Sequence, residues 1–517
     1  MAKYLVKRII RGIISVIIVV GIVMLLIFSL MDRELVLSND SVITKLGGND
    51  LTVYKYQVWE NYGYIDYVPY SDYLTSLESS GEIDANTRKT AATLGKTVSS
   101  DNATTAKYVK KFSEYYESKG YTVTRLKGFN SKGGNPQLFA YQDIHLLKRM
   151  WNYFSGILSV DSIHYADEIE GERGLSFTWY DPVYGGKKFS PAIIGNGTKH
   201  KYLLYFDNKF PFIHQNIVKI NLGVSYSVNK GIDIADTMTN SQGGFEQSTI
   251  HYPTGITEVS ADDLHSAKYS KGSRALSDYN KEHYTDDYTV ISVKGAAMSK
   301  MGFSFAIGIL SVIMAYVLGV PLGIMMARNK DKLLDKLGTI YIVFIMAVPS
   351  LAYIFIFSAI GRAIGLPTTF SVSEPTTLMY ILPIVSLALP SVANLMKWLR
   401  RYMIDQQNSD YVKFARSGGL SEREIFNKHI LKNAIIPLVH GIPGSVLGAL
   451  TGAIITERVY TVPGAGNLLT TAINKYDNSV IVGVTLFYAV LSVVSIILGD
   501  ILMSMVDPRI SFSDKAR

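Results

Sequence analysis

The chain has 517 residues, of which 48% are apolar and 18% charged, with a formal net charge of +8 and a mean hydropathy of +0.16. A positive mean hydropathy at this length is typical of a membrane protein and unusual for a soluble one. The absence of cysteine excludes disulfides, thiolate metal sites and cysteine nucleophiles.

The first expected element is a membrane helix near the N-terminus. Its uncharged run from Gly12 to Met31 covers about 30 Å at 1.5 Å per residue, which is enough to cross the hydrocarbon core. A cleaved signal peptide would have a similar basic start, but this run is longer and Leu30-Met31-Asp32-Arg33 offers no small-residue cleavage site. We therefore expect an anchored helix within residues 1–31.

Residues 32–300 are polar and rich in tyrosine, and we expect them to form a mixed α/β domain. Aromatic residues at helical spacing predict a helix over 103–119, followed by a strand at 121–124. Further strands are expected at 175–180 and 201–206. Three dipeptides mark turns between them: Asp181-Pro182, Gly185-Gly186 and Asn196-Gly197.

Five more uncharged runs follow, so the sequence predicts six membrane spans in all. They cover residues 301–327, 337–361, 375–396, 433–456 and 479–499. Lys and Arg crowd the loops on the side of the N-terminus, whereas the short loops on the other side hold only Arg362, Arg458 and Lys475. The positive-inside rule then places both termini in the cytoplasm and residues 32–300 outside. Because these Lys and Arg residues cluster beside the predicted spans, they indicate the cytoplasmic edge of a membrane protein rather than a surface that binds nucleic acid.

Ionisable residues are scarce inside these spans. His440 and Asp500 are the main ones, and we expect His440 to be a hydrogen-bonded residue facing the bundle rather than a proton relay. Carriers driven by ion or proton gradients usually need such groups along the path. If the chain transports a solute, its energy should therefore come from elsewhere.

The polar segment from Asp410 to Leu438 lies between two spans and has the signals of two short helices. Asn408 and Ser409 can cap a helix that begins near Asp410, and Gly418 and Gly419 can end it with positive φ. Ser421 and Glu424 then fit a capping box that starts a second helix. A hinged pair of helices at a membrane edge is typical of a docking surface.

Signatures of catalysis are weak. Gly95-Lys96-Thr97 resembles the end of a phosphate-binding loop, but Thr90 replaces the required first glycine. No histidine pair has metal-ligand spacing, and no nucleophile elbow occurs. We expect no enzymatic activity and no cofactor in this chain.

Several motifs carry a family resemblance. Residues 410–420, DYVKFARSGGL, with 429–437, resemble the coupling (EAA) loop of permease subunits of binding-protein-dependent ABC importers, in the oligopeptide (Opp/Ami) branch. Residues 222–226 and 483–487 fit the same branch. So do the following residues of the C-terminal half, for which the resemblance implies a structural role: Glu457, Pro463, Gly464, Gly466, Asp477, Asp507 and Pro508.

The sequence departs from the general pattern of the coupling loop at four positions. Lys413 and Phe414 replace its glutamate and first alanine, Gly418 stands where lysine is common, and Lys432 replaces its closing proline. A salt bridge from the usual glutamate is therefore not expected. The resemblance still implies that this loop docks on a cytoplasmic ATPase through the following residues: Tyr411, Lys413, Phe414, Ala415, Arg416, Gly418, Gly419 and Leu420.

The resemblance implies an α-helical ABC type I importer permease fold with six transmembrane helices and an inserted extracellular mixed α/β domain. The expected parts are a first segment, 1–31, an extracellular domain, 32–300, a permease core, 301–510, with its coupling loop at 400–433, and a cytoplasmic tail, 511–517. The implied location is the bacterial plasma membrane.

The implied partners are a second homologous permease subunit, two cytoplasmic ATPases that hold ATP and Mg²⁺, a substrate-binding lipoprotein, an oligopeptide substrate and membrane lipid, with no nucleic acid. We expect the extracellular domain to be the platform that meets the lipoprotein. Another substrate of the same branch, such as a nickel chelate, glutathione or a sugar, is the main alternative. A membrane-anchored extracellular receptor or enzyme is the other.

Overall fold

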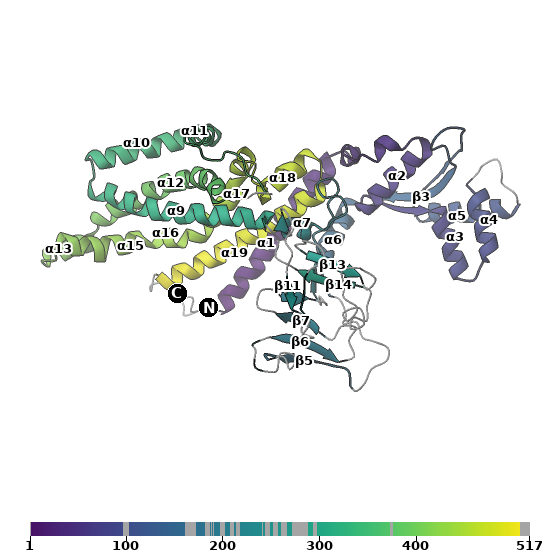
Figure 1. Ribbon diagram of the computed structural model, residues 1–517, viewed down its shortest axis with the longest axis horizontal. Coiled ribbons are helices and arrows are strands. Elements are labelled where there is room, and N and C mark those ends of the chain that lie inside the picture. Colours follow the sequence, from purple (N-terminus) through teal and green to yellow (C-terminus); the bar gives the residue numbers. More distant parts are fainter. Residues whose placement is uncertain are drawn as a thin grey trace.

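The computed structural model describes residues 2–96, 103–160, 172–180, 187, 189, 191–196, 202–206, 211–213, 218–239, 241–242, 249–251, 257–259, 266–270, 288–292, 297–372 and 376–506. A helical bundle forms one end of the molecule and the insert between the first two long helices forms the other (Figure 1).

Four helices within the described residues are long and apolar enough to cross a membrane. They are α1 (Ala2–Leu30), α9 (Lys300–Arg328), α12 (Ile381–Gln407, with η5, Thr377–Tyr380, before it) and α19 (Asn478–Val506). Glycines let α9 and α12 approach closely, because a Cβ at Gly319 or Gly323 would lie 3.0 to 3.2 Å from Leu395 or Leu399. The first, second, fourth and sixth expected spans are therefore confirmed as helices.

The other two expected spans are bent, so the described residues hold up to six spans only if each bent pair counts as one. Helix α10 (Leu333–Ala347) meets α11 (Ser350–Ala363) at 112°, with Pro349 at the break. The run from Glu422 to His440 meets α17 (Ile442–Val459) at 43°, where Pro443 falls in the first turn of α17. A proline lacks the N–H that would continue the helix, so bends occur at these points.

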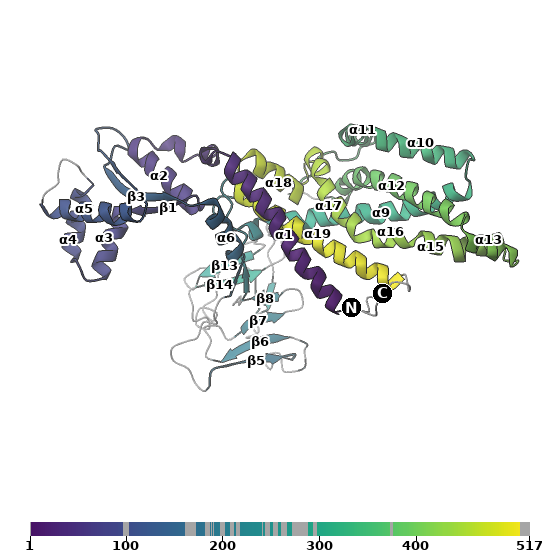
Figure 2. The same ribbon diagram turned by 180° about the vertical axis from the view of Figure 1, so that it is seen from behind.

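Between α12 and α17 the polypeptide forms a series of short helical segments. They are α13 (Asp410–Ser417), α14 (Glu422–Glu424), the π-helical η6 (Ile425–Leu431), α15 (Lys432–Ala434) and α16 (Ile436–His440). Helix α18 (Ala465–Asn474) follows α17. Helix α13 lies at the end of the bundle farthest from the insert (Figures 1 and 2).

The first part of the insert is a small α/β unit. Its sheet is antiparallel with order β1-β3-β2, and aromatic side chains such as Tyr70, Phe112 and Phe139 fill its core. The expected helix and strand at 103–124 are confirmed by α5 and β2. The elements are η1 (Arg33–Leu37), η2 (Ile43–Lys45), α2 (Gly48–Asn61), β1 (Ile65–Pro69), α3 (Tyr70–Ser79), α4 (Ala85–Leu94), α5 (Ala103–Ser118), β2 (Thr122–Leu126) and β3 (Gln137–Asp143).

The described residues of the second part of the insert form two helices that pack against the bundle, α6 (Leu146–Gly156) and α7 (Ile234–Thr239), and several antiparallel strand groups. The expected strands at 175–180 and 201–206 are confirmed by β5 and β7, which lie in a sheet of order β5-β6-β7-β8. The expected turns at 181–182 and 185–186, and Gly197 of the third turn, fall outside the described residues.

The elements of this part, in chain order, are α6 (Leu146–Gly156), β4 (Leu158–Val160), β5 (Gly174–Thr178), β6 (Ala192–Asn196), β7 (Tyr202–Phe206), β8 (Pro211–Ile213), β9 (Val218–Ile220), α7 (Ile234–Thr239), β10 (Ser241–Gln242), β11 (Thr249–His251), β12 (Thr257–Val259), β13 (Ser266–Ser270), β14 (Tyr288–Ser292) and β15 (Ala297–Ser299). Strand β6 was not expected from the sequence.

The buried carboxylate of Asp477 joins the insert to the bundle. Its Oδ2 accepts hydrogen bonds from the Ser225 hydroxyl at 2.7 Å and from the backbone N–H groups of residues 226, 227 and 228 at 2.9 to 3.0 Å. Its Oδ1 accepts a hydrogen bond from Val480 N–H at 3.4 Å, at the start of α19. A buried charge with this many donors is satisfied, so it fixes the segment 225–228 on the end of α19.

A second buried carboxylate joins α10 to α12 near the opposite end of the bundle. Asp335 accepts hydrogen bonds from Arg400 at 2.5 and 2.7 Å and from the N–H of Asp331 at 2.9 Å. The paired guanidinium and carboxylate form a two-point contact with defined geometry. Because α10 otherwise exposes many apolar residues, this ion pair sets its position beside α12.

We predict that Asp477→Ala lowers the free energy of unfolding by about 3 kcal/mol, because it leaves several buried donors without an acceptor. Thermal unfolding of the detergent-purified chain measures the loss. Asp143→Ala is the matched control, since that carboxylate is 68% exposed in its ion pair with Arg33 and should contribute under about 1 kcal/mol. Equal losses for both variants would contradict the role given to Asp477.

We predict that Arg400→Gln costs about 3 kcal/mol of unfolding free energy, since it leaves the Asp335 carboxylate buried without its cation. Asp335→Asn should cost less, because the remaining guanidinium is 29% exposed and can be solvated. Arg401→Gln is the control, as its side chain is 65% exposed and lies 4.0 Å from Asp405. Thermal unfolding measures the stability of each variant. Equal stability of the Arg400→Gln and Arg401→Gln variants would refute the prediction.

Candidate functional site

Helix α13 begins where the sequence predicts, but without the expected side-chain caps. The Ser409 hydroxyl donates to the carbonyl oxygen of Gln406 at 2.6 Å instead of accepting from the first turn of α13. Asp410 lies in that first turn, where its negative charge favours the helix dipole. The expectation of a cap from Asn408 or Ser409 was therefore wrong, because the hydroxyl satisfies the end of α12.

The other end of α13 is closed by the glycine pair. The Leu420 N–H donates to the carbonyl of Ala415 and the Gly419 N–H to that of Arg416, at 3.3 and 3.1 Å. This pattern is a Schellman motif, which needs a residue with left-handed backbone conformation. Gly419 supplies it with φ of +82°, whereas Gly418 keeps a φ of −75°, so only the second glycine takes the expected positive φ.

Helix α13 has one side toward the bundle and one toward solvent. Val412 is fully buried and Ala415 is nearly so, in a core cluster with Leu399, Met403 and Ile425. Phe414 on the other side is 80% exposed. A phenylalanine with this exposure, held on a helix whose opposite side is fixed by packing, is available to a partner.

Two of the predicted docking residues contact the chain itself. Ala415 faces the bundle, because a residue three positions after Val412 lies on the same side of the helix, and Val412 is buried there. The hydroxyl of Tyr411 donates to Gln406 at 2.5 Å and accepts from the Asn433 side chain at 3.0 Å, and its side chain is 37% exposed. Tyr411 therefore ties α13 to α15 and α12 while keeping one ring edge accessible.

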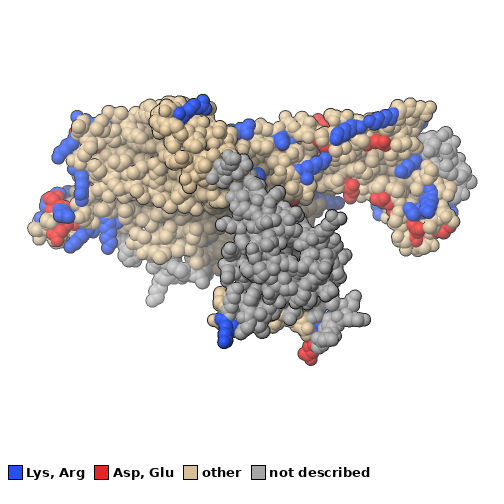
Figure 3. Space-filling model, in the orientation of Figure 1, with Lys and Arg blue, Asp and Glu red and all other residues tan. Residues whose placement is uncertain are grey.

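Charged residues of this segment are paired within it. Lys413 donates a hydrogen bond to Asp410 at 2.9 Å, and this bond together with the lysine charge lowers the pKa of that exposed carboxyl. Arg416 donates to both oxygens of Glu422, at 2.5 and 3.1 Å across the glycine pair, and this contact raises the pKa of the guanidinium. Figure 3 shows charged side chains gathered at this end of the bundle, whereas most of the bundle face behind it is free of blue and red.

The second half of the segment starts as predicted and then departs from a regular helix. Ser421 and Glu424 form the expected capping box. The following turns are π-helical at η6, a rare arrangement that widens the helix and often accompanies functional sites. Leu420, between the two halves, is 40% exposed.

A cavity of about 680 Å³ lies inside the bundle, between α9, α11, α12 and α17. Small and polar residues contribute much of its wall, and no charged side chain is among the residues that line it. They are Val312, Ala315, Tyr316, Ser350, Tyr353, Leu387, Pro390, Ser391, Asn394, Leu395, Gly441, Gly444, Ser445, Gly448, Ala449 and Ile455. A Cβ added at Gly444 or Gly448 would meet open space. The wall of this cavity can therefore form hydrogen bonds with a polar ligand, and its described residues carry no charged group that would favour a ligand of one charge.

Two of the predicted structural residues, Gly464 and Gly466, lie against a third, Glu457. This buried carboxylate accepts hydrogen bonds from the Ser304 hydroxyl at 2.5 Å and from Asn467 N–H at 3.0 Å. A side chain at Gly464 would collide with it, and one at Gly466 would lie 2.7 Å from Ile454. The two glycines are thus required by close packing, and Asp477 has the separate role described above. Asp507 and Pro508 lie outside the described residues.

The two ionisable residues expected at membrane depth have different surroundings. Asp500 accepts a hydrogen bond from the Tyr4 hydroxyl and pairs with Arg8, both at 2.9 Å, which joins α19 to α1. His440 has a buried Nδ1 with no hydrogen-bond partner among the described residues, so the expected hydrogen bond is not formed at this nitrogen. Its ring lies against Gly499 of α19, in agreement with the expected position facing the bundle.

Sequence reasoning missed several residues of the bundle. Val412 lies within the coupling-loop motif but was not singled out, Asp335 and Arg400 carried no motif, and the two cavity glycines lie in a run that looks like any apolar span. One signal was available in the sequence. Val412 and Ala415 are apolar residues three positions apart among polar neighbours, a spacing that predicts one buried side of a helix. Within the described ranges, no group of three or more His, Cys, Asp and Glu side chains could hold a metal ion.

Comparisons with known proteins agree with this architecture. Residues 319–512 match the family model of the binding-protein-dependent transport system inner membrane component. The chain is 33% identical over its whole length, and over 99% of the relative, to the oligopeptide transport system permease protein AmiC of Streptococcus pneumoniae. It is 34% identical to the dipeptide transport system permease protein DppB of Lactococcus lactis, over 43% of this chain and 73% of that protein.

The match to AmiC includes the insert, which the family model does not cover. The apolar helices and the family together make the chain a multi-pass membrane protein with a type I importer permease fold. With a full-length relative above 30% identity, this chain belongs to the family of binding-protein-dependent transport system inner membrane components, the permease subunits of ABC importers.

Proposed function

We propose that this chain is a permease subunit of an ATP-driven importer that takes up oligopeptides delivered by an extracellular binding lipoprotein. The observation that carries the proposal is the position of α13, which exposes Phe414 at the end of a bundle that also contains an uncharged cavity. Similarity to an oligopeptide permease over the full length favours peptides over a nickel chelate, glutathione or a sugar.

In this proposal α13 docks on a cytoplasmic ATPase. Phe414 is the apolar anchor, the partly exposed Leu420 and Tyr411 add apolar surface, and Lys413 and Arg416 form a charged rim. Val412 and Ala415 lock the opposite side of α13 into the bundle core, so a displacement of α13 would be passed to α12 and α9. Because the energy enters from ATP in a partner, no ionisable group along the path is needed.

The cavity between α9, α11, α12 and α17 is the proposed part of the substrate path. Its lining offers hydroxyl and amide groups from Ser391, Asn394 and Ser445 that can bond a peptide backbone. A lining without charged side chains suits peptides of varied sequence, because no charged wall residue would repel peptides that carry the same charge. A second homologous permease subunit is expected to complete the path.

The proposed orientation puts α13 and both termini in the cytoplasm and residues 32–300 outside. The clustering of Lys and Arg at the α13 end supports it. The insert is then the platform for the lipoprotein, and two ATPases with ATP and Mg²⁺ complete the complex. The exposed aromatic residues of the insert, among them Trp179 and Phe189, suit reversible protein contacts.

We predict that Phe414→Asp lowers peptide uptake on the order of tenfold or more, because a charge replaces the apolar anchor of the interface. Uptake of labelled peptide and co-purification of the ATPase are measured in membranes with equal amounts of chain. Leu333→Asp is the control, since Leu333 is also apolar and 70% exposed but lies on α10. Normal co-purification and uptake with Phe414→Asp would sink the docking proposal.

We predict that a large side chain at Gly448 blocks transport without unfolding the chain. The Cβ position is open, so Gly448→Trp fills the cavity and should lower uptake roughly tenfold or more, while the ATPase still co-purifies. Gly448→Ala, which adds one carbon, should keep uptake near the wild-type value. Full uptake with Gly448→Trp at normal expression would remove this cavity from the path.

A further inference from the structure

Helix α6 has an apolar arc that is wider than the surface it packs against. Met150, Tyr153, Phe154 and Ile157 recur at helical spacing and pack on Val20, Met24 and Val482 of α1 and α19. Leu147 and Trp151 continue the same arc to roughly 160° at about 100° per residue. Yet Leu147 is 67% exposed and Trp151 is 72% exposed.

The strands next to α6 add two more exposed apolar residues. Leu158 of β4 pairs directly with Ile220 of β9, so their side chains lie on one face, and they are 62% and 61% exposed. Leu147, Trp151, Leu158 and Ile220 together are named here the α6 patch. Large apolar side chains with this exposure, on a part of the chain that is not a membrane span, mark a contact with another apolar phase.

The position of α6 along α1 indicates what that phase is. The Met150 methyl group lies 3.2 Å from the Cβ position of Gly21, ten residues before the end of the uncharged run at Met31. At 1.5 Å per residue, this contact is about 15 Å inside the end of the run. The α1 residues beside it, Ile22, Leu25 and Leu26, are about half exposed and apolar, as lipid-facing residues are. Figure 2 shows α6 lying beside α1 on the near side of the molecule.

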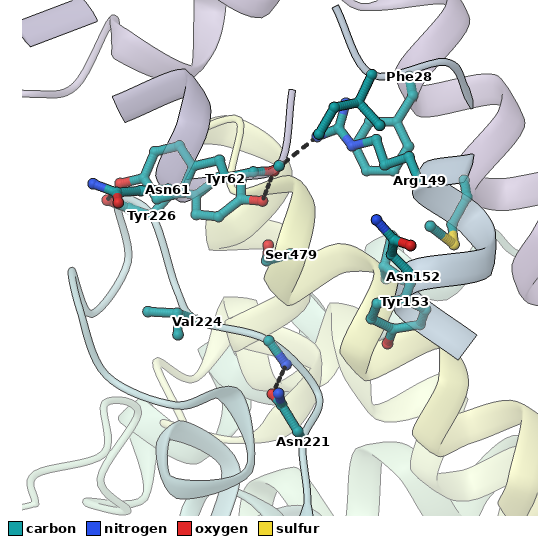
Figure 4. Close-up of a pocket in the computed structure, with 15 residues that line it drawn as sticks. Phe28, Asn61, Tyr62, Arg149, Asn152, Tyr153, Asn221, Val224, Tyr226 and Ser479 are labelled. Carbon is teal, nitrogen blue, oxygen red and sulfur yellow. Dashed lines mark hydrogen bonds between the residues drawn. The ribbon is translucent and has the colours of Figure 1, made fainter. Parts of the chain in front are cut away.

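The polar side of α6 is turned away from this surface. Arg149 donates to the carbonyl oxygen of Tyr62 at 3.0 Å, and its guanidinium lies 3.7 and 3.6 Å from the ring centres of Phe28 and Tyr64. Arg149 and Asn152 line a pocket of about 300 Å³ between α6, α2 and α19 (Figure 4). Lys148 is exposed beside the patch, where its long chain can reach lipid headgroups.

We propose that α6 is a membrane-embedded helix, with the α6 patch facing lipid in the bilayer leaflet nearest the insert. Trp151 follows Met150 directly along α6, so it lies within the hydrocarbon of that leaflet together with the rest of the patch. The insert is then held on the bilayer at two points, the end of α1 and α6. This second contact limits how the insert can tilt relative to the bundle.

The chain has no cysteine, so single introduced thiols test the proposal without background. Leu147→Cys, Trp151→Cys and, as the matched control on the polar side, Lys148→Cys are labelled with a nitroxide in membranes that contain the chain with its transporter partners. Relaxation of each label by oxygen, which partitions into lipid, is compared with relaxation by a water-soluble nickel complex. Equal amounts of folded chain are verified by gel filtration.

The expected result is that labels at 147 and 151 respond several-fold more to oxygen than to nickel, whereas the label at 148 responds mainly to nickel. Nickel access at 147 and 151 equal to that at 148 would show a surface in water and overturn the proposal. Protection of 147 and 151 from both reagents would overturn it as well, since a protein partner rather than lipid would then cover the patch.

Discussion

A bundle in a bilayer can hold a carboxylate only where its oxygens are hydrogen-bonded or paired, and this constraint organises the ends of the helices here. Asp335 is paired with Arg400, Glu457 is bonded to Ser304 and Asn467, and Asp477 gathers the donors of residues 225–228. Each contact joins segments that are distant in sequence. The middle of the bundle can therefore remain uncharged, with its cavity open.

The same contacts hold the two ends of the bundle in place, one at α13 and the other at the insert. Asp335 and Arg400 fix α10 beside α12 at the end that carries α13, so the buried side of α13 packs on a defined surface. At the other end, Asp477 fixes the segment that leads from the insert back toward the bundle. In the proposed mechanism, a displacement at α13 would be applied to packed helices while the insert stays attached to α19. Alternating access requires such a rigid connection.

The insert distinguishes this chain from shorter relatives such as DppB, whose match covers 43% of the chain. Its first unit is a compact α/β fold with an aromatic core. Lys230 and Tyr54 meet Asp40 at its edge, and although burial alone would raise the pKa of Asp40, their hydrogen bonds lower it below its ordinary value. Because the folded pKa is depressed, this contact stabilises the insert at neutral pH and is lost only as pH falls through that value.

The sequence by itself determined the long apolar helices, the basic edge of the bundle and the capping box at Ser421, and the family motif singled out Glu457, Gly464 and Gly466 without showing that they touch. These depend on composition, on local hydrogen bonding and on motifs that are contiguous in the chain. Only the tertiary structure decided which side of α13 is buried, that Ser409 caps α12 instead of α13, and where Pro349 bends its span. It also decided the partners of Asp335 and the wide apolar arc of α6. The Ser409 contact is local, three positions away, so there the structure selected one of two local hydrogen bonds. The buried side of α13 and the pairing of Asp335 with Arg400, 65 positions away, depend on residues that are not neighbours in sequence, and no local pattern encodes which of them meet.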